Sequence, residues 1–438
     1  MSGEGKETIG VIGVGWVGLV TASCFAELGH PVVARDIVAE KVASLSRGET
    51  TIHEPGLDDL LARNSERLAF TTEMGELLER ARLIFVCVDT PPTHSGDADL
   101  SRVRAVVEEL PEGGDQVLIM KSTVPAGTGE AIRRDRPGLA YVSCPEFLKE
   151  GTAVEDFMHP DRVVIGADAG DEAAGDAVAG LYEPLGGEAV RTDVASAEMI
   201  KLASNAFLAT KISFVNEIAN VCEEVGADVA EVARGMGLDD RIGAKFLKAG
   251  IGWGGSCFGK DTIALKKLAG NSGYHFQLLS AVIDVNELQK RRVVQKLKSH
   301  LDSLAGRRVA LLGLAFKPDT DDMRDAASLV LAARLEGEGA EVVAYDPVAA
   351  DRARRLLPTV ELCDSALAAL DGADAAVLVT EWPEFAELDW GEAAGRMAQP
   401  LLIDGRNFLD AGALQAAGFE YEGIGRATAS APSAVTSD

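Results

Sequence analysis

A glycine-rich segment near the N-terminus, GVGWVG at residues 13–18, sets the first limit on the fold. It overlaps the end of an apolar run at residues 9–14 that is typical of a strand, and it leads into a helix-like segment at about residues 17–28, with Gly29 as the C-cap. A second apolar run, PVVAR, ends at Asp36. This order predicts a βαβ unit, in which glycines allow a tight turn and let a pyrophosphate approach the N-terminus of the helix.

The position of Asp36 indicates which dinucleotide such a unit binds. Asp36 lies eighteen residues after Gly18, at the end of the second strand, where a carboxylate accepts the ribose hydroxyls of NAD and repels a 2′-phosphate. Arg35 beside it leaves NADP as an alternative, and a glycine-rich turn in an unrelated α/β protein is the other. We therefore predict that NAD is bound by Gly13, Val14, Gly15, Trp16, Val17, Gly18 and Asp36.

The chain divides into segments of different character. Apolar runs at 83–88, 117–120 and 163–165 alternate with helix-like segments, which predicts a doubly wound, mainly parallel sheet in residues 1–195. From Ser196 almost thirty residues lack a strong helix breaker and are apolar around most of the helix, so we expect a long buried helix and a helical domain over 196–304.

Strand-like runs return at Arg308, and their order repeats that of the N-terminal part. We predict a second Rossmann-like domain at 305–425, without a second dinucleotide site because its turn is GLAFKP instead of GxGxxG. Residues 426–438 are small and polar and are expected to form a disordered tail.

Composition excludes several classes of partner. The 42 basic and 69 acidic residues give a net charge of -27, which would repel nucleic acid and anionic membranes. The N-terminus lacks a signal-like segment and no run of eighteen apolar residues occurs, so a soluble cytoplasmic protein is expected. Six scattered cysteines without a CxxC pair predict reduced thiols and no metal site.

Cys257 is the predicted nucleophile. It lies in the glycine-rich loop GIGWGGSCFGKD at residues 250–261, where backbone N–H groups can stabilise an oxyanion and Lys260 can lower the pKa of a thiol. An isolated cysteine is more often a small buried hydrophobic residue. That alternative suits the other cysteines in apolar runs, namely Cys24, Cys87, Cys222 and Cys363.

Polar residues on the long helix form a second candidate group. Lys201 and Asn205 are four residues apart and share one helical face, with Asn216 about three turns further along. They could hold a substrate alcohol and its alkoxide, or Lys201 could simply pair with a carboxylate. Glu146 follows the strand-like run YVSC, and the carboxyl end of a parallel strand faces the ligand crevice in open sheets.

Two cations, Lys317 and Arg324, lie in the acidic segment FKPDTDDMRD at residues 316–325. They could bind phosphates, although charged runs are more often only solvated.

Several segments resemble blocks of the UDP-glucose/GDP-mannose dehydrogenase family and occur in the family order. They are KSTVPAGT from Lys121, CPEFLKEGTAVEDF from Cys144, EMIKLASNAFLATKISFVNE from Glu198, DDRIGAKFLKAGIGWGGSCFGKD from Asp239, GLAFKPDTDDMRDAAS from Gly313, and DGRN from Asp404. The resemblance implies an N-terminal NAD domain, a helical dimerisation domain and a C-terminal nucleotide-sugar domain.

The resemblance also implies roles for individual residues. NAD would contact Asp36, Lys41, Thr90, Thr123, Glu150, Lys260 and Arg324. The nucleotide sugar would contact Glu146, Phe147, Leu148, Lys149, Glu150, Lys201, Asn205, Phe246, Leu247, Lys248, Ala249, Gly250, Gly254, Lys317 and Arg406. Arg241 would reach the site of a partner subunit, which implies a homodimer or a higher homo-oligomer.

The implied reaction oxidises UDP-glucose to UDP-glucuronate with two NAD. Water ordered by Thr123 and Asp261 would take the alcohol proton, while Lys201 and Asn205 stabilise the oxyanion. Cys257 would trap the aldehyde as a thiohemiacetal, which becomes a thioester that is hydrolysed near Glu146 or Asp261.

Other readings stay open at this point. The substrate could be GDP-mannose or UDP-N-acetylmannosamine, the enzyme could be a two-electron β-hydroxyacid dehydrogenase, or the chain could be a non-catalytic sensor. Cys144, Asp89 and Ala327 depart from the family pattern. Of these, Cys144 leaves the polar support of Glu146 in question, and Asp89 adds a negative charge near the nicotinamide end.

Overall fold

The computed structural model describes residues 6–111 and 113–426, so all but the first residue of the predicted tail lies outside the described residues. The chain forms two compact units. The first comprises residues 1–205 and 260–275, and the second comprises 206–259 and 276–438. The division into three domains made from the sequence stays a prediction.

The first unit contains an eight-stranded sheet in the order β3-β2-β1-β4-β5-β6-β7-β8. All neighbouring strands are parallel except β6 and β7. The predicted doubly wound, mainly parallel sheet is therefore confirmed, and the strand order reverses between β1 and β4, where such sheets open a ligand crevice. The strands are β1 (Ile9–Ile12), β2 (Val32–Arg35), β3 (Leu68–Thr71), β4 (Leu83–Val86), β5 (Val117–Met120), β6 (Ala140–Ser143), β7 (Arg162–Gly166) and β8 (Glu188–Thr192).

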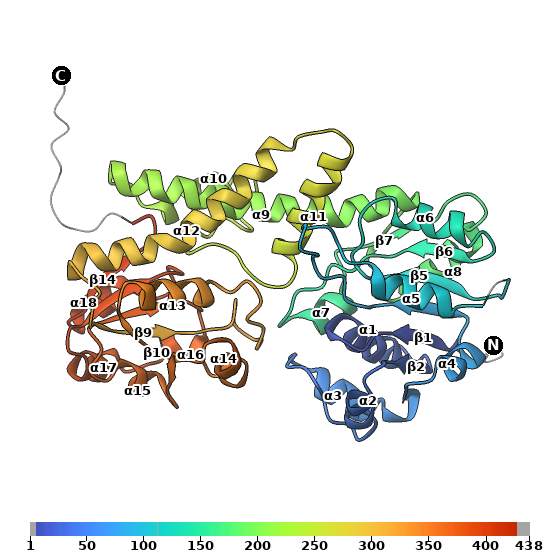
Figure 1. The fold of residues 1–438 in the computed structure, drawn as a ribbon, viewed down its shortest axis with the longest axis horizontal. Helices are drawn as coiled ribbons and strands as arrows, with labels where there is room; N and C mark the ends of the chain where they lie inside the picture. The colour runs from blue at the N-terminus through green and yellow to red at the C-terminus, as the bar shows by residue number, and fades with distance from the viewer. Residues whose placement is uncertain (1–5, 112, 427–438) are drawn as a thin grey trace. The chain divides into compact units, whose positions relative to one another are not determined.

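Both faces of this sheet are covered because apolar residues occupy every position of its central strands. In β4, Leu83 and Phe85 point to one apolar cluster and Ile84 and Val86 to the other. Helices from two groups complete these clusters, and Figure 1 shows these helices in blue to green. One group is α1 (Trp16–Glu27), α2 (Ala39–Ser46), α3 (Leu57–Arg63), α7 (Ala153–Met158) and α8 (Glu172–Tyr182), and the other is α4 (Met74–Arg80), α5 (Ser101–Glu109) and α6 (Thr128–Asp135).

The second unit contains a six-stranded parallel sheet in the order β11-β10-β9-β12-β13-β14. This order matches the first six positions of the N-terminal sheet, so the predicted second Rossmann-like fold is confirmed (Figure 1, orange to red). Its elements are β9 (Arg308–Leu312), α13 (Ala327–Gly337), β10 (Glu341–Tyr345), α14 (Ala350–Leu356), β11 (Glu361–Leu362), α15 (Ala366–Leu370), β12 (Ala375–Leu378), α16 (Pro383–Ala386), α17 (Trp390–Arg396), β13 (Leu401–Asp404), α18 (Ala411–Ala416) and β14 (Glu420–Gly423).

Between the two sheets in sequence lie α9 (Val194–Val225), α10 (Val229–Gly237), α11 (Phe258–Asn271) and α12 (Gln277–Leu301). The predicted long helix is α9, a single helix of 32 residues. The expectation that it is buried is wrong for the single chain, because four of its large apolar side chains are each at least 48% exposed. They are Phe207 (64%), Phe214 (48%), Val221 (56%) and Val225 (71%).

The glycine-rich loop is shorter than predicted. Its last four residues, from Phe258 to Asp261, form the first turn of α11. A helix can start there because only Gly259 interrupts the segment before Gly270, and because Asp261 suits the positive end of the helix dipole.

All six cysteines are free thiols, as predicted. Cys24, Cys87 and Cys222 are buried, whereas Cys363 is only partly buried, which corrects the expectation for that residue. Among the described residues, no helix combines the length and hydropathy that crossing a lipid bilayer requires.

Candidate active site

The turn between β1 and α1 has the geometry of a dinucleotide cradle. A Cβ on Gly18 would lie 1.8 Å from the carbonyl oxygen of Gly13, so only glycine allows this close approach of strand and helix. The N-cap of α1 is Gly15, and no side chain caps the helix there. The N–H groups of the first turn therefore suit a pyrophosphate, and the residues present fit NAD.

Asp36 completes this cradle at the end of β2. Its carboxylate accepts hydrogen bonds from the N–H groups of Val14 and Val38, both at 3.0 Å, and pairs with Lys41 at 3.0 Å. Arg35 instead pairs with Glu109 at 2.9 Å and donates to the carbonyl of Thr72. Arg35, the residue that left NADP as an alternative cofactor, is therefore engaged with other residues.

Glu146 and Lys201 form a buried ion pair. The Nζ of Lys201 lies 2.8 Å from Oε1 of Glu146, and the two side chains are 4% and 5% exposed. Burial, the largest influence, raises the pKa of Glu146, but the charge and hydrogen bond of Lys201 and the N–H of Leu148 outweigh it, so the net pKa is lowered. Lys201 and the N–H of Leu148 therefore supply the polar support of Glu146 that the departure at Cys144 left in question.

Asn205 and Asp261 form a second buried pair in the same unit. The Nδ2 of Asn205 donates to Oδ2 of Asp261 at 2.6 Å, and Lys260 pairs with Oδ1 at 2.6 Å. Lys201 and Asn205 share one face of α9, as their spacing predicts, and each meets a different predicted carboxylate. Lys201 therefore does pair with a carboxylate, which was the alternative to a role in binding the substrate alcohol, and its partner Glu146 is itself a candidate site residue.

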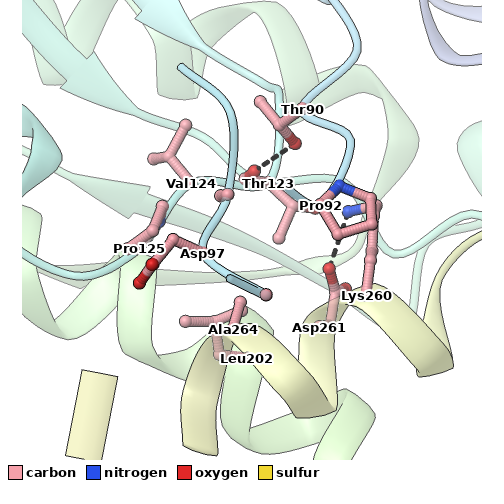
Figure 2. A pocket seen from close by; sticks show the side chains of 12 residues that line it. Thr90, Pro92, Asp97, Thr123, Val124, Pro125, Leu202, Lys260, Asp261 and Ala264 are labelled. Carbon is pink, nitrogen blue, oxygen red and sulfur yellow. Dashed lines mark hydrogen bonds and ion pairs between the residues drawn. The ribbon is translucent and has the colours of Figure 1, made fainter. Parts of the chain in front are cut away.

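A pocket lies beside this second pair, and Figure 2 shows the side chains that line it. The hydroxyl of Thr90 donates to the carbonyl of Thr123 at 2.8 Å, which joins the loops after β4 and β5. Asp89, which precedes Thr90, pairs with Arg102 at 2.8 Å. The lining residues are Thr90, Pro92, Gly96, Asp97, Ala98, Thr123, Val124, Pro125, Leu202, Lys260, Asp261 and Ala264.

Cys257 lies in the second unit, at the end of a loop that the backbone holds tightly. Its thiol is partly exposed and lies 3.5 Å from the hydroxyl of Ser256. Gly255 has φ +88°, and a Cβ there would lie 2.7 Å from the ring of Phe316. Its N–H donates to the carbonyl of Arg324 at 2.9 Å, so the glycines let this loop pack directly against the segment after β9.

Arg406 connects the same loop to the C-terminal sheet. Its guanidinium donates to the carbonyls of Gly252 at 3.1 Å, Val379 at 2.7 Å and Phe316 at 3.3 Å. The planar guanidinium, whose donors have fixed directions, therefore serves three backbone segments at once.

The other predicted residues of the second unit are more separate. Arg324 pairs with Asp322 at 2.7 Å, and Arg241 pairs with Asp239 at 2.6 Å. The ammonium of Lys317 lies 5.4 Å from the ring centroid of Phe316. In the segment 246–250, Phe246 is exposed with φ 65°, Leu247 and Ala249 are buried, Lys248 pairs with Glu381 at 4.0 Å, and the N–H of Gly250 donates to Asn216 at 2.8 Å.

In the first unit, the segment after Glu146 contacts residues of β7, α7 and α9. The cations of Arg162 and Lys201 lie 3.8 and 5.3 Å from the ring centroid of Phe147. Glu150 is buried, and Lys149 pairs with Asp156 at 2.6 Å. The structure thus joins Glu146 with Lys201, Asn205 with Asp261, and Thr90 with Thr123, while Cys257, Lys317, Arg324 and Arg406 belong to the other unit.

Sequence reasoning missed the polar residues that position these loops. Asn286 exchanges two hydrogen bonds with the backbone of Trp253, at 2.8 and 3.0 Å, and Gln289 donates to the carbonyl of Gly250 at 2.9 Å. Both lie on α12 at positions where Val282 and Val293 continue the buried apolar face. A polar residue at a core position of a helix was the signal that could have found them.

The first sheet is a Rossmann sheet whose glycine turn and Asp36 suit NAD, and the second is a Rossmann-like sheet without such a turn. This combination defines the architecture of an NAD-dependent dehydrogenase with a separate nucleotide domain. Comparison with known families agrees with that class. Residues 7–186 match the NAD binding domain, 195–288 the central domain, and 310–411 the UDP binding domain of the UDP-glucose/GDP-mannose dehydrogenase family. The chain belongs to this family, and its cofactor is NAD.

Individual relatives cover nearly the whole chain. It is 46% identical to the UDP-glucose 6-dehydrogenase TuaD of Bacillus subtilis, over 95% of this chain and 93% of the relative. It is also 46% identical to a UDP-glucose 6-dehydrogenase of Pseudomonas aeruginosa, over 95% and 97%. Among solved structures, a UDP-glucose dehydrogenase of Pyrobaculum islandicum superposes with a TM-score of 0.89 at 37% identity, covering 98% of this chain and 100% of the other.

Proposed function

We propose that the chain oxidises the 6-hydroxymethyl group of UDP-glucose to a carboxylate, using two NAD per sugar. The observation that carries this proposal is the resemblance over 95% of the chain to relatives named UDP-glucose 6-dehydrogenase, at 46% identity. The match of residues 310–411 to the UDP binding domain of the UDP-glucose/GDP-mannose dehydrogenase family supports a nucleotide sugar as the substrate.

The chemistry that NAD supplies when bound is acceptance of a hydride, and the cradle of Gly13, Gly18 and Asp36 would hold it. In the first oxidation, the alcohol of the sugar loses a proton to water that Asp261 and Thr123 orient. Lys201 and Asn205 stabilise the oxygen while negative charge develops on it. The lowered pKa of Glu146 keeps a carboxylate beside Lys201 at neutral pH.

Cys257 is proposed to act on the resulting aldehyde. Its sulfur forms a bond to the carbonyl carbon while the C=O π bond breaks, and the thiol proton is delivered through water to the carbonyl oxygen, which gives a thiohemiacetal. The second oxidation converts this adduct to a thioester, and water then breaks the carbon–sulfur bond to release the carboxylate and regenerate the thiol. The stability of a covalent adduct explains how one chain could carry out a four-electron oxidation without releasing an aldehyde.

The test is a stoichiometric assay of the purified protein with UDP-glucose and NAD. We expect two NADH per UDP-glucuronate, whereas a two-electron hydroxyacid dehydrogenase would give one. GDP-mannose and UDP-N-acetylmannosamine serve as competing substrates, and faster turnover of either one than of UDP-glucose would refute the proposed substrate.

The variant Cys257→Ser tests the covalent step. We expect it to keep NAD affinity within about twofold and to lose at least about a thousandfold of UDP-glucuronate formation. The matched control is Cys363→Ser, which changes another partly exposed thiol and should keep full activity. Unchanged turnover in Cys257→Ser would rule out the thioester route.

We also propose that a second copy of the chain covers the exposed stripe of α9, formed by Phe207, Phe214, Val221 and Val225. These residues lie seven, seven and four positions apart and therefore share one helical face. An apolar stripe of this kind on a soluble enzyme is typical of an interface. Arg241, whose side chain is 88% exposed, would then serve the partner's site.

A further inference from the structure

Glu54 is a buried carboxylate that no part of the proposed reaction uses. It lies between α2 and α3, in a segment of the first unit, and its residue is 5% exposed. Oε2 accepts a hydrogen bond from the indole N–H of Trp16 at 2.9 Å and another from the N–H of Gly151 at 2.8 Å. Oε1 accepts from the N–H of Ala153 at 2.8 Å.

The three donors come from two places that matter for ligand binding. Trp16 is the first residue of α1, inside the glycine-rich turn that suits the pyrophosphate of NAD. Gly151 and Ala153 follow directly after the segment 146–150, which begins with the buried Glu146. One carboxylate oxygen therefore connects the cofactor turn, 38 residues before Glu54, with the end of the proposed sugar-binding segment, 97 residues after it.

The connection is strong because hydrogen bonds to an ionised acceptor are stronger than neutral ones, particularly in a buried place. An anion buried without donors would be very costly, so Glu54 holds its donors in fixed positions. If a bound cofactor fixes Trp16, it also fixes the carboxylate and hence the amides of Gly151 and Ala153. Part of the entropy lost in ordering the 146–151 segment is then already lost before the sugar binds.

We propose that the Trp16–Glu54–Gly151 connection couples NAD binding to nucleotide-sugar binding, so that each ligand raises the affinity for the other. The proposal rests on the proposed function, because it assigns residues 146–150 to the sugar. Glu54 and Trp16 act here as positioning residues through backbone groups. Reciprocity is required by linkage, so either ligand can be titrated.

The experiment uses calorimetric titration of the full chain with NADH, alone and with saturating UDP-glucose. NADH and UDP-glucose cannot react with each other, so the complex stays unchanged during the titration. The coupling factor is the Kd of NADH alone divided by its Kd with UDP-glucose. We expect at least about fivefold for the wild-type chain.

The decisive variant is Trp16→Phe, which removes the indole N–H but keeps the backbone donors of the turn and the other two bonds of Glu54. Its matched control is Trp390→Phe, which removes the same kind of bond, from the indole to the carbonyl of Phe385 at 3.0 Å, in the second unit. Glu54→Gln is a second variant, in which the amide nitrogen cannot accept from Ala153 or Gly151. Circular dichroism of each variant verifies folding.

We expect the coupling factor to fall by about threefold or more in Trp16→Phe and to stay at the wild-type value in Trp390→Phe. A smaller fall in Trp16→Phe, an equal fall in the control, or a wild-type factor of about one would overturn the coupling. If the wild-type chain binds NADH but produces no heat with UDP-glucose, the proposed substrate fails, and the coupling fails with it. A separate titration of the wild-type chain with UDP-glucose distinguishes the two failures, because the NADH titration gives a factor of about one in both cases.

Discussion

The buried pair of Lys201 and Glu146 allows a quantitative test of the site. The perturbation is Lys201→Met, which keeps a long apolar side chain but removes the ammonium that lies 2.8 Å from Oε1 of Glu146. Both side chains are almost fully buried, so water cannot replace the lost partner. The N–H of Leu148, at 2.6 Å from Oε2, is a remaining donor that the structure identifies for the carboxylate.

The expected magnitude follows from burial and charge. Removing one partner of a buried ion pair costs about 3–5 kcal/mol, because an uncompensated charge stays inside. In the variant, burial dominates and the pKa of Glu146 rises above its ordinary value of 4.5. Stability that depends on a raised carboxyl pKa is present below the unfolded pKa and is lost as pH rises, so the destabilisation should grow from about pH 5 to about pH 8.

The wild-type chain should show the opposite sign for this residue. Because its folded pKa is lowered, Glu146 contributes stability above pH 4.5 that is lost as the pH falls. Both effects make the difference in unfolding free energy between the wild type and Lys201→Met smaller at acidic pH, by up to about 1.4 kcal/mol for each pH unit. Urea unfolding followed by circular dichroism at several pH values measures this difference.

Two comparisons make the test strict. The double variant Lys201→Met with Glu146→Gln removes both charges, and we expect it to be more stable than Lys201→Met alone by about 1–3 kcal/mol. The control is Lys149→Met, whose side chain is 58% exposed beside Asp156, with an expected cost below about 1 kcal/mol. Additive losses in the double variant, or a loss in Lys201→Met that does not change with pH, would refute the reasoning.

Two further outcomes are expected. Burial raises the pKa of Glu198 to about 7, although the N–H groups at the N-terminus of α6 act in the opposite direction. The thermal midpoint of the wild type relative to that of Glu198→Gln should therefore fall as the pH rises from about 5 to about 8. A difference in midpoint that does not change with pH would contradict this. Phe214→Glu in the exposed stripe of α9 should convert a dimer to a monomer, as measured by light scattering. The control Leu356→Glu, at an exposed position of α14, should leave the dimer intact. A monomeric wild type would contradict the proposed interface.

Much of the fold could be predicted because its strands and helices follow local rules. The apolar runs of β1, β4 and β5, the glycine turn at 13–18 and the helix of α9 all depend on residues close in sequence. The antiparallel pairing of β6 and β7 could not be predicted, because it joins strands of the same composition as the parallel ones. The exposure of Phe207 and Phe214 also contradicts a pattern that, taken alone, indicates burial.

The sequence suggested candidate residues for the site, whose roles stay predictions, but it could not give the contacts between them. Lys201 and Glu146 are 55 residues apart, and Asn205 and Asp261 are 56 apart, so their pairing depends on the tertiary structure. Glu54 was missed because a single glutamate is ordinarily a surface residue, and its donors at Gly151 and Ala153 are backbone groups that leave no trace in the sequence.

These contacts also determine how the roles of the site residues can be separated by mutation. Four proposed catalytic groups of the first unit support one another in pairs, Lys201 with Glu146 and Asn205 with Asp261. A single substitution therefore changes two groups, and the loss in kcat/KM measures the pair instead of the residue. If the pairs act as units, the loss in kcat/KM of the double variant Lys201→Met with Glu146→Gln will be much smaller than the product of the two single losses. In the double variant Lys201→Met with Asp261→Asn, whose residues belong to different pairs, the loss in kcat/KM will be closer to that product.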